Sequence, residues 1–258
     1  MLVGLEEQVK GKKMLQDNLN IRGYYFSKLD HLEDHRRLLA DIGELLAVKG
    51  TVILSEEGIN LSIVGKRSDS EQMFEACKSI PGLEKLSPKK DWSNNNPYEK
   101  LKIKIKDEII KMNKPGIRPE LKRASSVDSK TFSRWLIQGC DDSGLPIKIF
   151  DTRNHFEIEM GRFAKCLDFG LKRFSDFPNI FDKNKSKLEG HRVITVCTGG
   201  IRCEKATLYM NQNGIPNAVQ LEGGILEYIQ STDGKFWSGE CFEFKNQNLY
   251  EEDLTLGV

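Results

Sequence analysis

The chain has 258 residues, 38% of them hydrophobic and 30% charged, which describes a soluble globular protein with room for one large or two ordinary domains. Its 39 Lys and Arg residues almost balance 38 Asp and Glu residues, so the net charge of +1 excludes a strongly basic, polyanion-binding chain, and only a local basic cluster can indicate such a partner. No run approaches the roughly 18 apolar residues of a membrane span, and the charged start lacks the apolar centre of a signal peptide, so we expect a cytoplasmic protein without membrane contact.

The first half of the chain predicts a strand, a helix, two strands, a second helix and a last strand. Apolar residues at helical spacing over 30–50 predict a helix that stops at Gly50. Alternating lysine and apolar residues over 99–112 predict the last strand of this half. This order is the split βαβ arrangement, so we predict a ferredoxin-like domain over residues 20–112.

The second half follows a segment rich in proline, glycine and serine, which predicts a linker over 113–128. Strands then alternate with helices, which predicts an α/β domain with a parallel sheet over 129–245, followed by a C-terminal tail over 246–258. Ligand sites of such sheets lie at the carboxyl ends of the strands. Cys197 directly follows the apolar strand 193–196 and is therefore expected at such an end.

The loop after Cys197 leads within a few residues into a predicted helix. Its backbone N–H groups and the positive end of the helix dipole point into the loop, and Arg202 adds a positive charge. These features predict a nucleophilic thiol with a lowered pKa. Cys203 lies in the same field, so Cys197, Cys203 and Arg202 are the catalytic candidates, with Cys203 as nucleophile or as resolving thiol. The rest of the predicted active-site loop is Thr198, Gly199, Gly200 and Ile201.

Two other interpretations of this loop are weaker. A lone cysteine at a strand end is usually a small buried residue, but the two glycines and the arginine favour a site. A phosphatase loop has the spacing Cys-x5-Arg, whereas this loop is Cys-x4-Arg and suits a terminal sulfur on the cysteine better than a phosphate. The six cysteines and four histidines lack metal-ligand spacing, so no metal site is predicted and no cofactor is evident.

Three segments of the second half resemble a rhodanese domain. They are FDTRNHFEIEMGRF at 150–163, the cysteine loop, and LEGGI at 221–225. The resemblance covers about 125–245 and implies a rhodanese-like fold for this part of the chain. Asp151 and Arg153, at a strand end, are expected to support the loop through an ion pair rather than to touch substrate.

A closer resemblance rests on CTGGIRCEK at 197–205, SEEGIN at 55–60 and DTRN at 151–154. Together these strings are similar to the bacterial tRNA uridine hydroxylase family, which joins an N-terminal ferredoxin-like domain to a rhodanese domain. The resemblance implies oxygen-dependent conversion of the wobble uridine, tRNA position 34, to 5-hydroxyuridine. It implies molecular oxygen as co-substrate and the tRNA anticodon arm as partner. The alternatives are a sulfurtransferase, which takes sulfur from thiosulfate or a persulfide donor through a cysteine persulfide, and a non-catalytic RNA-binding module.

A tRNA partner requires a basic surface on a chain of nearly neutral charge. Between Lys85 and Arg123, basic residues outnumber acidic ones. A predicted strand in this segment directs Leu101, Ile103 and Ile105 to the core and lysines to the other face. The alternative is a merely solvated face or a protected sheet edge. The residues assigned to RNA binding are Lys100, Lys102, Lys104 and Lys106.

Overall fold

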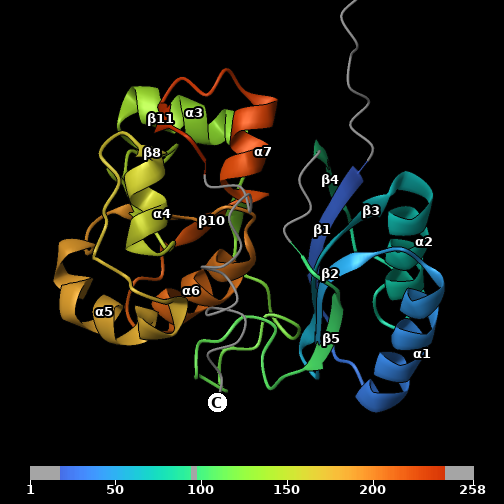
Figure 1. Cartoon of the computed structure of the whole chain (residues 1–258). Coiled ribbons are helices and arrows are strands. Elements are labelled where there is room, and N and C mark those ends of the chain that lie inside the picture. Colours follow the sequence, from blue (N-terminus) through green and yellow to red (C-terminus); the bar gives the residue numbers. More distant parts are fainter. Residues whose placement is uncertain (1–17, 94–97, 242–258) are drawn as a thin grey trace, which may run out of the picture.

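The computed structural model describes residues 18–93 and 98–241, so the predicted tail over 246–258 lies outside the described residues. Two halves lie side by side, each built around its own sheet (Figure 1). The first half holds β1 (Asn18–Phe26), α1 (Leu32–Leu45), β2 (Lys49–Ser55), β3 (Gly58–Lys66), α2 (Arg67–Lys78), β4 (Lys89–Ser93) and β5 (Leu101–Ile105). The strand order of its sheet is β4-β1-β3-β2-β5.

Four of these strands form the ferredoxin-like arrangement that the sequence predicted. β1 pairs antiparallel with both β3 and β4, and β2 pairs antiparallel with β3. α1 and α2 cover one face of the sheet, and their apolar side chains share a single core with those of the strands (Figure 1). The other face of the sheet is turned toward the second half, which places it opposite the cysteine loop.

The sequence missed one strand of this half. The strand beside β1 is β4, whereas the alternating segment forms the predicted last strand, β5, which runs parallel to β2 at the opposite edge of the sheet. The sequence of β4, KKDWS, is mostly polar and shows no apolar alternation, so it gave no strand signal. The alternation of β5 does reflect a buried face, because Leu101, Ile103 and Ile105 pack against the core.

The first helix also ends earlier than predicted. α1 ends at Leu45, and Gly50 lies inside β2 instead of stopping the helix. Gly50 has a φ of +138°, and a Cβ atom there would lie 2.2 Å from the carbonyl oxygen of Ser62 on β3. The glycine therefore permits the close approach of two neighbouring strands.

The second half is built on a parallel sheet, as the sequence predicted. Its four strands have the order β6-β10-β9-β7, and every neighbouring pair is parallel. Its elements are β6 (Ser126–Val127), α3 (Ser129–Gln138), β7 (Ile147–Asp151), α4 (His155–Met160), β8 (Gly161–Phe163), η1 (Phe174–Asp176), α5 (Phe177–Asn184), η2 (Lys185–Lys187), β9 (Arg192–Val196), α6 (Ile201–Gln212), β10 (Val219–Leu221), α7 (Gly224–Ser231) and β11 (Trp237–Gly239). β8 and β11 pair with each other in a separate antiparallel ribbon.

Two hydrophobic cores flank the parallel sheet. Val193 of β9 belongs to one core, whereas Ile194 and Val196 belong to the other, as expected for a strand buried on both faces. Ile117, in the predicted linker, is buried in the first of these cores, and the end of that linker forms β6. The domain boundaries themselves stay predictions. Within the described ranges, no helix has the length and apolar character needed to span a membrane.

Candidate active site

Cys197 lies at the carboxyl end of β9, and its side chain is buried. The loop passes through Gly200, whose φ of +103° favours glycine, and α6 then begins at Ile201. The backbone N–H of Gly200 donates a hydrogen bond to Cys197 Sγ at 3.1 Å. At Gly199, apart from its chain neighbours, no atom of the residues that the structure describes lies within 4 Å of the position that a Cβ would take. The loop is therefore tight around the sulfur and open beside it.

The two cysteines of the loop differ in acidity. Burial by itself raises the pKa of the Cys197 thiol. Hydrogen bonds from Cys203, together with the Arg202 charge and a backbone N–H, outweigh burial and lower this pKa to about 6. Burial raises the pKa of Cys203 well above its usual value, and the hydrogen bond to Cys197 raises it further. At neutral pH, Cys197 is therefore a thiolate, and Cys203 is a protonated thiol that donates to it.

Arg202 is held by a carboxylate of α4. Its Nη1 and Nη2 donate to the two carboxylate oxygens of Glu157, at 2.6 and 2.9 Å. Glu157 also accepts from the backbone N–H of Asn154 at 3.0 Å and from the Thr198 hydroxyl at 3.4 Å. Thr198 and Arg202 lie near the two ends of the loop. Because both donate to the buried Glu157 carboxylate, this one group holds both ends in place. Arg202 thus acts on the cysteine through its charge, while its hydrogen bonds hold the loop.

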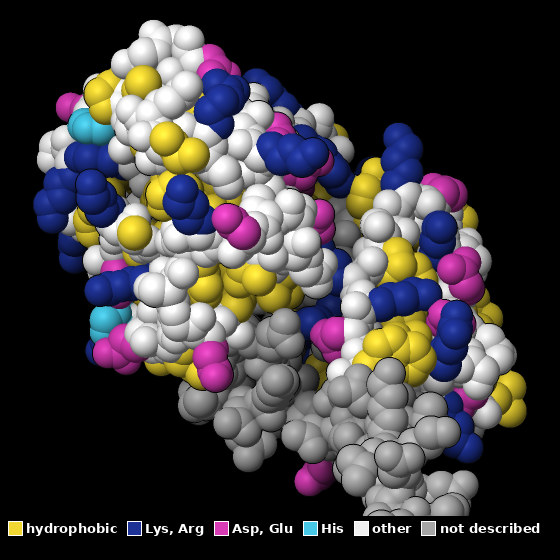
Figure 2. All heavy atoms as spheres, turned by 90° about the horizontal axis from the view of Figure 1, so that it is seen from above, with side chains coloured by type: hydrophobic (Ala, Val, Ile, Leu, Met, Phe, Trp, Pro, Cys, Tyr) yellow, Lys and Arg dark blue, Asp and Glu magenta, His cyan; other side chains and the backbone are white. Residues whose placement is uncertain are grey.

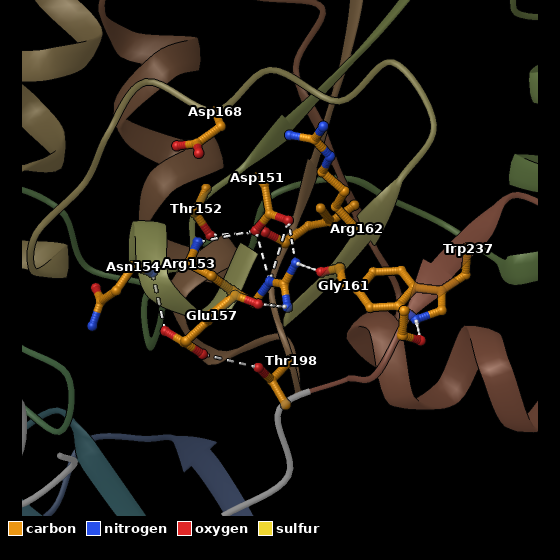
Figure 3. A network of polar contacts seen from close by, with 12 residues as sticks. Asp151, Thr152, Arg153, Asn154, Glu157, Gly161, Arg162, Asp168, Thr198 and Trp237 are labelled. Carbon is orange, nitrogen blue, oxygen red and sulfur yellow. Dashed lines mark hydrogen bonds and ion pairs between the residues drawn. The ribbon is translucent and has the colours of Figure 1, made fainter. Parts of the chain in front are cut away.

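The predicted ion pair of Asp151 and Arg153 supports α4 directly. Both side chains are fully buried, and Arg153 Nη2 donates to Asp151 Oδ2 at 2.6 Å. Arg153 also donates to the carbonyl oxygens of Glu157 and Gly161, at 3.2 and 2.8 Å, and so ties α4 to the end of β7 (Figure 3). Because α4 carries Glu157, the pair supports the cysteine loop through this helix.

A second buried charge cluster joins the two halves of the molecule. Lys205, on α6, is 1% exposed, and its Nζ lies 2.8 Å from Glu57 Oε2 and 2.5 Å from Glu108 Oε2. Glu57 belongs to the turn between β2 and β3, within the string at 55–60, and Lys205 ends the string at 197–205. The turn therefore does more than connect a hairpin, since its carboxylate holds the helix that follows the cysteine loop.

Cys197 lines a cavity of about 330 Å³ between the two halves. One wall is the sheet face that α1 and α2 leave uncovered, and the opposite wall is the cysteine loop. The Tyr24 hydroxyl reaches this loop, because a Cβ on Gly200 would lie 2.7 Å from it. The volume is that of a small-molecule site. The lining includes Arg22, Tyr24, Thr51, Ile53, Lys85, Lys89, Arg123, Cys197, Thr198, Gly199, Ile201, Arg202 and Glu204.

The lysines assigned to RNA binding lie in and beside β5, at an edge of the sheet. Lys102 and Lys104 are level with Thr51 and Ile53 of β2, and both of those residues line the cavity. The two lysines therefore lie on the cavity side of the sheet. The lysines that flank the strand are Lys100 and Lys106.

Other basic side chains lie nearer to the cysteine. Lys85, Lys89 and Arg123 line the cavity itself, and Lys89 Nζ donates to the carbonyl oxygen of Gly223 in the second half. Arg22, on β1, also lines the cavity and forms an ion pair with Asp91. Figure 2 shows Lys and Arg side chains on both halves, including beside the junction between them.

Several cavity and junction residues received no role from the sequence, and three of them are Tyr24, Glu204 and Lys205. Glu204 and Lys205 lie inside CTGGIRCEK, so the family resemblance marked them, but their contacts with Arg123 and Glu57 arise only in the folded chain. Tyr24 follows no pattern that separates it from the other residues of β1. These three residues depend on how the halves pack, which the local sequence does not specify.

The first half matches a known domain family, and parts of the chain resemble solved structures at low identity. Residues 19–109 match the UPF0176 acylphosphatase like domain. The rhodanese-like domain from Anabaena sp. is 17% identical, with a TM-score of 0.36, and the match covers 45% of this chain and 80% of that chain. An acylphosphatase from Coxiella burnetii is 16% identical, with a TM-score of 0.29, over 34% of this chain and 94% of that chain.

Curated relatives match almost the whole chain. The tRNA uridine(34) hydroxylase of Burkholderia mallei (strain NCTC 10229) is 42% identical over 241 residues, which are 92% of this chain and 81% of that protein. The protein of the same name from Burkholderia ambifaria (strain MC40-6) is 42% identical over 240 residues, 92% of this chain and 84% of that protein. The similarity therefore extends through both halves.

Proposed function

The chain belongs to the tRNA uridine(34) hydroxylase family, and from this membership we propose that Cys197 is the reactive thiol for a uridine that enters the cavity between the halves. The protein is a tRNA-modifying enzyme whose rhodanese-like half carries this cysteine. We propose molecular oxygen as co-substrate and 5-hydroxyuridine as product, with one oxygen atom placed on C5 of the uracil and the other reduced to water by two electrons from an external reductant. The anticodon arm is the part of the tRNA that presents position 34.

One observation carries the assignment of Cys197: its buried thiol lies on the wall of a cavity large enough for a nucleobase and accepts a hydrogen bond from the Gly200 N–H. A base can reach such a wall only after it leaves the stack of the anticodon loop, as in other enzymes that act on bases. The Gly200 N–H and the Cys203 thiol hold the negative charge on Cys197 Sγ. The bound base then meets a thiolate that is already formed and held in place.

The basic residues near the cavity support RNA binding. Lys85, Lys89 and Arg123 line it, and Lys102 and Lys104 lie on the same side of the sheet. Phosphates on either side of a flipped nucleotide need such cations within a few ångströms of the entrance. We propose that these side chains together hold the anticodon arm, with the lysines in and beside β5 as the outer part of the surface.

The test is mass spectrometry of tRNA nucleosides from a strain that lacks the protein. The strain is complemented with the intact chain, with Cys197→Ser or with Cys140→Ser, a control at a thiol outside the cavity. Wobble 5-hydroxyuridine should return with the intact chain and the control and stay absent with Cys197→Ser. Its return with Cys197→Ser excludes this thiol as essential. A 5-hydroxyuridine level that never depended on the protein contradicts the hydroxylase assignment.

In the last case, a sulfurtransferase becomes the leading assignment. The intact chain should then transfer sulfur rapidly from thiosulfate to cyanide, and Cys197→Ser should abolish the transfer, because the sulfur would be carried on that cysteine. A protein that restores 5-hydroxyuridine and transfers sulfur no faster than the Cys197→Ser variant excludes this alternative.

A further inference from the structure

Glu204 is a buried carboxylate on the cavity wall to which the proposed reaction assigns no task. It follows Cys203 in the first turns of α6, is 5% exposed, and lines the cavity together with Cys197 and Tyr24. Burial raises the pKa of its carboxyl, although a hydrogen bond from Gln220 and the Arg123 charge act in the opposite direction. A carboxyl group is thus kept out of water in the wall of the cavity that Cys197 also lines.

The Glu204 carboxylate is poorly paired for a buried acid. Its Oε2 has no hydrogen-bond partner among the residues that the structure describes. Its Oε1 lies 4.0 Å from Arg123 Nη1, and the Arg123 side chain is 50% exposed. Buried polar atoms without a partner are rare because they destabilise the folded state. A retained one at a cavity wall indicates a partner that arrives with a ligand.

We propose that Glu204 recognises the uracil base, with its carboxylate accepting a hydrogen bond from the N3–H of the uridine in the cavity. This inference rests on the proposed function, in which uridine 34 enters that cavity. The Watson–Crick edge of uracil presents one donor, N3–H, between the acceptors O2 and O4. An ionised carboxylate can only accept, so it complements the central N3–H group.

Two donors near Glu204 fit the carbonyl groups that flank N3–H. Burial, and then the Glu204 charge, raise the pKa of Tyr24 well above its usual value, so its hydroxyl keeps its proton and can donate. The guanidinium of Arg123 has donors only. Cytosine would instead set an unprotonated N3 against the carboxylate and an amino group against a donor. The set therefore favours uridine over cytidine.

The test measures binding of the intact purified chain to two anticodon stem-loops that differ only in U34 or C34. The wild type should prefer U34 by at least about tenfold, the loss expected when a hydrogen bond to a charged group is removed. Glu204→Met, which keeps the volume but has no acceptor, should reduce this preference to about twofold. Glu204→Gln should also reduce the preference for U34, but by improving C34 binding, because the glutamine amide can donate to cytosine N3. The exposed Glu222→Met is the control and should keep the wild-type preference.

Thermal unfolding separates this role from a structural one. If Glu204 is retained for substrate, Glu204→Met should raise the unfolding midpoint by about 2–4 °C, because it removes a poorly paired buried carboxylate. A lowered midpoint together with an unchanged U34 preference makes Glu204 structural and overturns the inference.

The outcomes also separate this inference from the proposed function. A wild type that binds U34 better than C34, with the same ratio in Glu204→Met, overturns the role of Glu204 and leaves the function standing. A wild type that binds both stem-loops equally also overturns the role of Glu204 and leaves the function standing. A wild type that binds neither stem-loop, and restores no 5-hydroxyuridine in the deletion strain, overturns both.

Discussion

The two sides of the cysteine loop differ in how their buried carboxylates are paired. Toward the second half, Glu157 accepts both Nη groups of Arg202, a backbone N–H and a hydroxyl. Glu204, which lines the cavity, has a buried oxygen without a hydrogen-bond partner in the described parts of the chain. Both glutamates are buried beside the same loop, so burial does not distinguish them. The two glutamates differ in how many of their carboxylate oxygens accept hydrogen bonds. This number separates Glu157, which supports the loop, from Glu204, which can accept a hydrogen bond from a ligand.

This difference matches the division of labour that a preorganised site needs. A thiolate is useful only where its position is fixed. The contacts of Glu157 and Arg153, on the side of the loop away from the cavity, provide that rigidity. Substrate recognition requires polar groups that can change partner, and the cavity side presents Tyr24 and Glu204.

The largest loss of stability is expected at Glu157, the carboxylate whose two oxygens both accept hydrogen bonds. Glu157→Gln leaves the buried Arg202 guanidinium without its counter-charge, so the free energy of unfolding should fall by about 3–5 kcal/mol. Urea denaturation measures this loss. Glu159→Gln, an exposed position on the same helix, is the matched control and should change stability by less than about 0.5 kcal/mol. Equal stability of the two variants would remove the contrast between Glu157 and Glu204.

A smaller loss is expected at the junction between the halves. Lys205→Met leaves Glu57 and Glu108 close together without the ammonium group that both contact, so unfolding should become easier by about 2–3 kcal/mol. Urea denaturation again provides the measurement, with the exposed Lys183→Met as control. If Lys205→Met is as stable as the control, the cluster contributes nothing to holding α6 against the first half.

A still smaller effect is expected on the RNA surface. Lys102→Glu with Lys104→Glu should weaken tRNA binding by about tenfold at moderate salt and flatten the plot of log K against log salt by about 2 units. The control, Arg37→Glu with Arg67→Glu, makes the same charge change on α1 and α2, which cover the far face of the sheet. An unchanged salt slope in the β5 variant would move the RNA surface elsewhere, toward Lys85 and Lys89.

The smallest change is in the rate of thiol alkylation, although its pH dependence is diagnostic. Iodoacetamide should modify Cys197 with a midpoint near pH 6, because its pKa is lowered to about 6, whereas Cys203 stays protonated and slow. At pH 7 the rate should exceed that of a free cysteine only a few-fold, since nucleophilicity falls with pKa. Cys203→Ala should raise the midpoint by removing a hydrogen-bond donor. A wild-type midpoint near 8.5, as for a free thiol, would contradict the thiolate assignment.

Elements with strong local signals were predictable from the sequence. The apolar run of β9 marked a strand buried on both faces, and the Asp128 side chain and Gly139 mark the two ends of α3. β4 was not predicted from the sequence, because it is a mostly polar strand whose position is set by pairing with β1. Gly50 was misread as a helix stop, because its actual task is the close approach of β2 to β3. Both errors concern contacts between strands.

By itself, the sequence indicated the order of most elements, though not β4, and it placed Cys197, its glycines and Arg202 in one continuous segment with a strand before it and a helix after it. Only the tertiary structure decided which partners those residues meet. Arg202 pairs with Glu157, and Lys205 meets Glu57, across long separations in the chain. Hydrogen bonds and burial depend on distances of a few ångströms that packing alone sets, and they separate the supporting carboxylate from the one that faces the cavity.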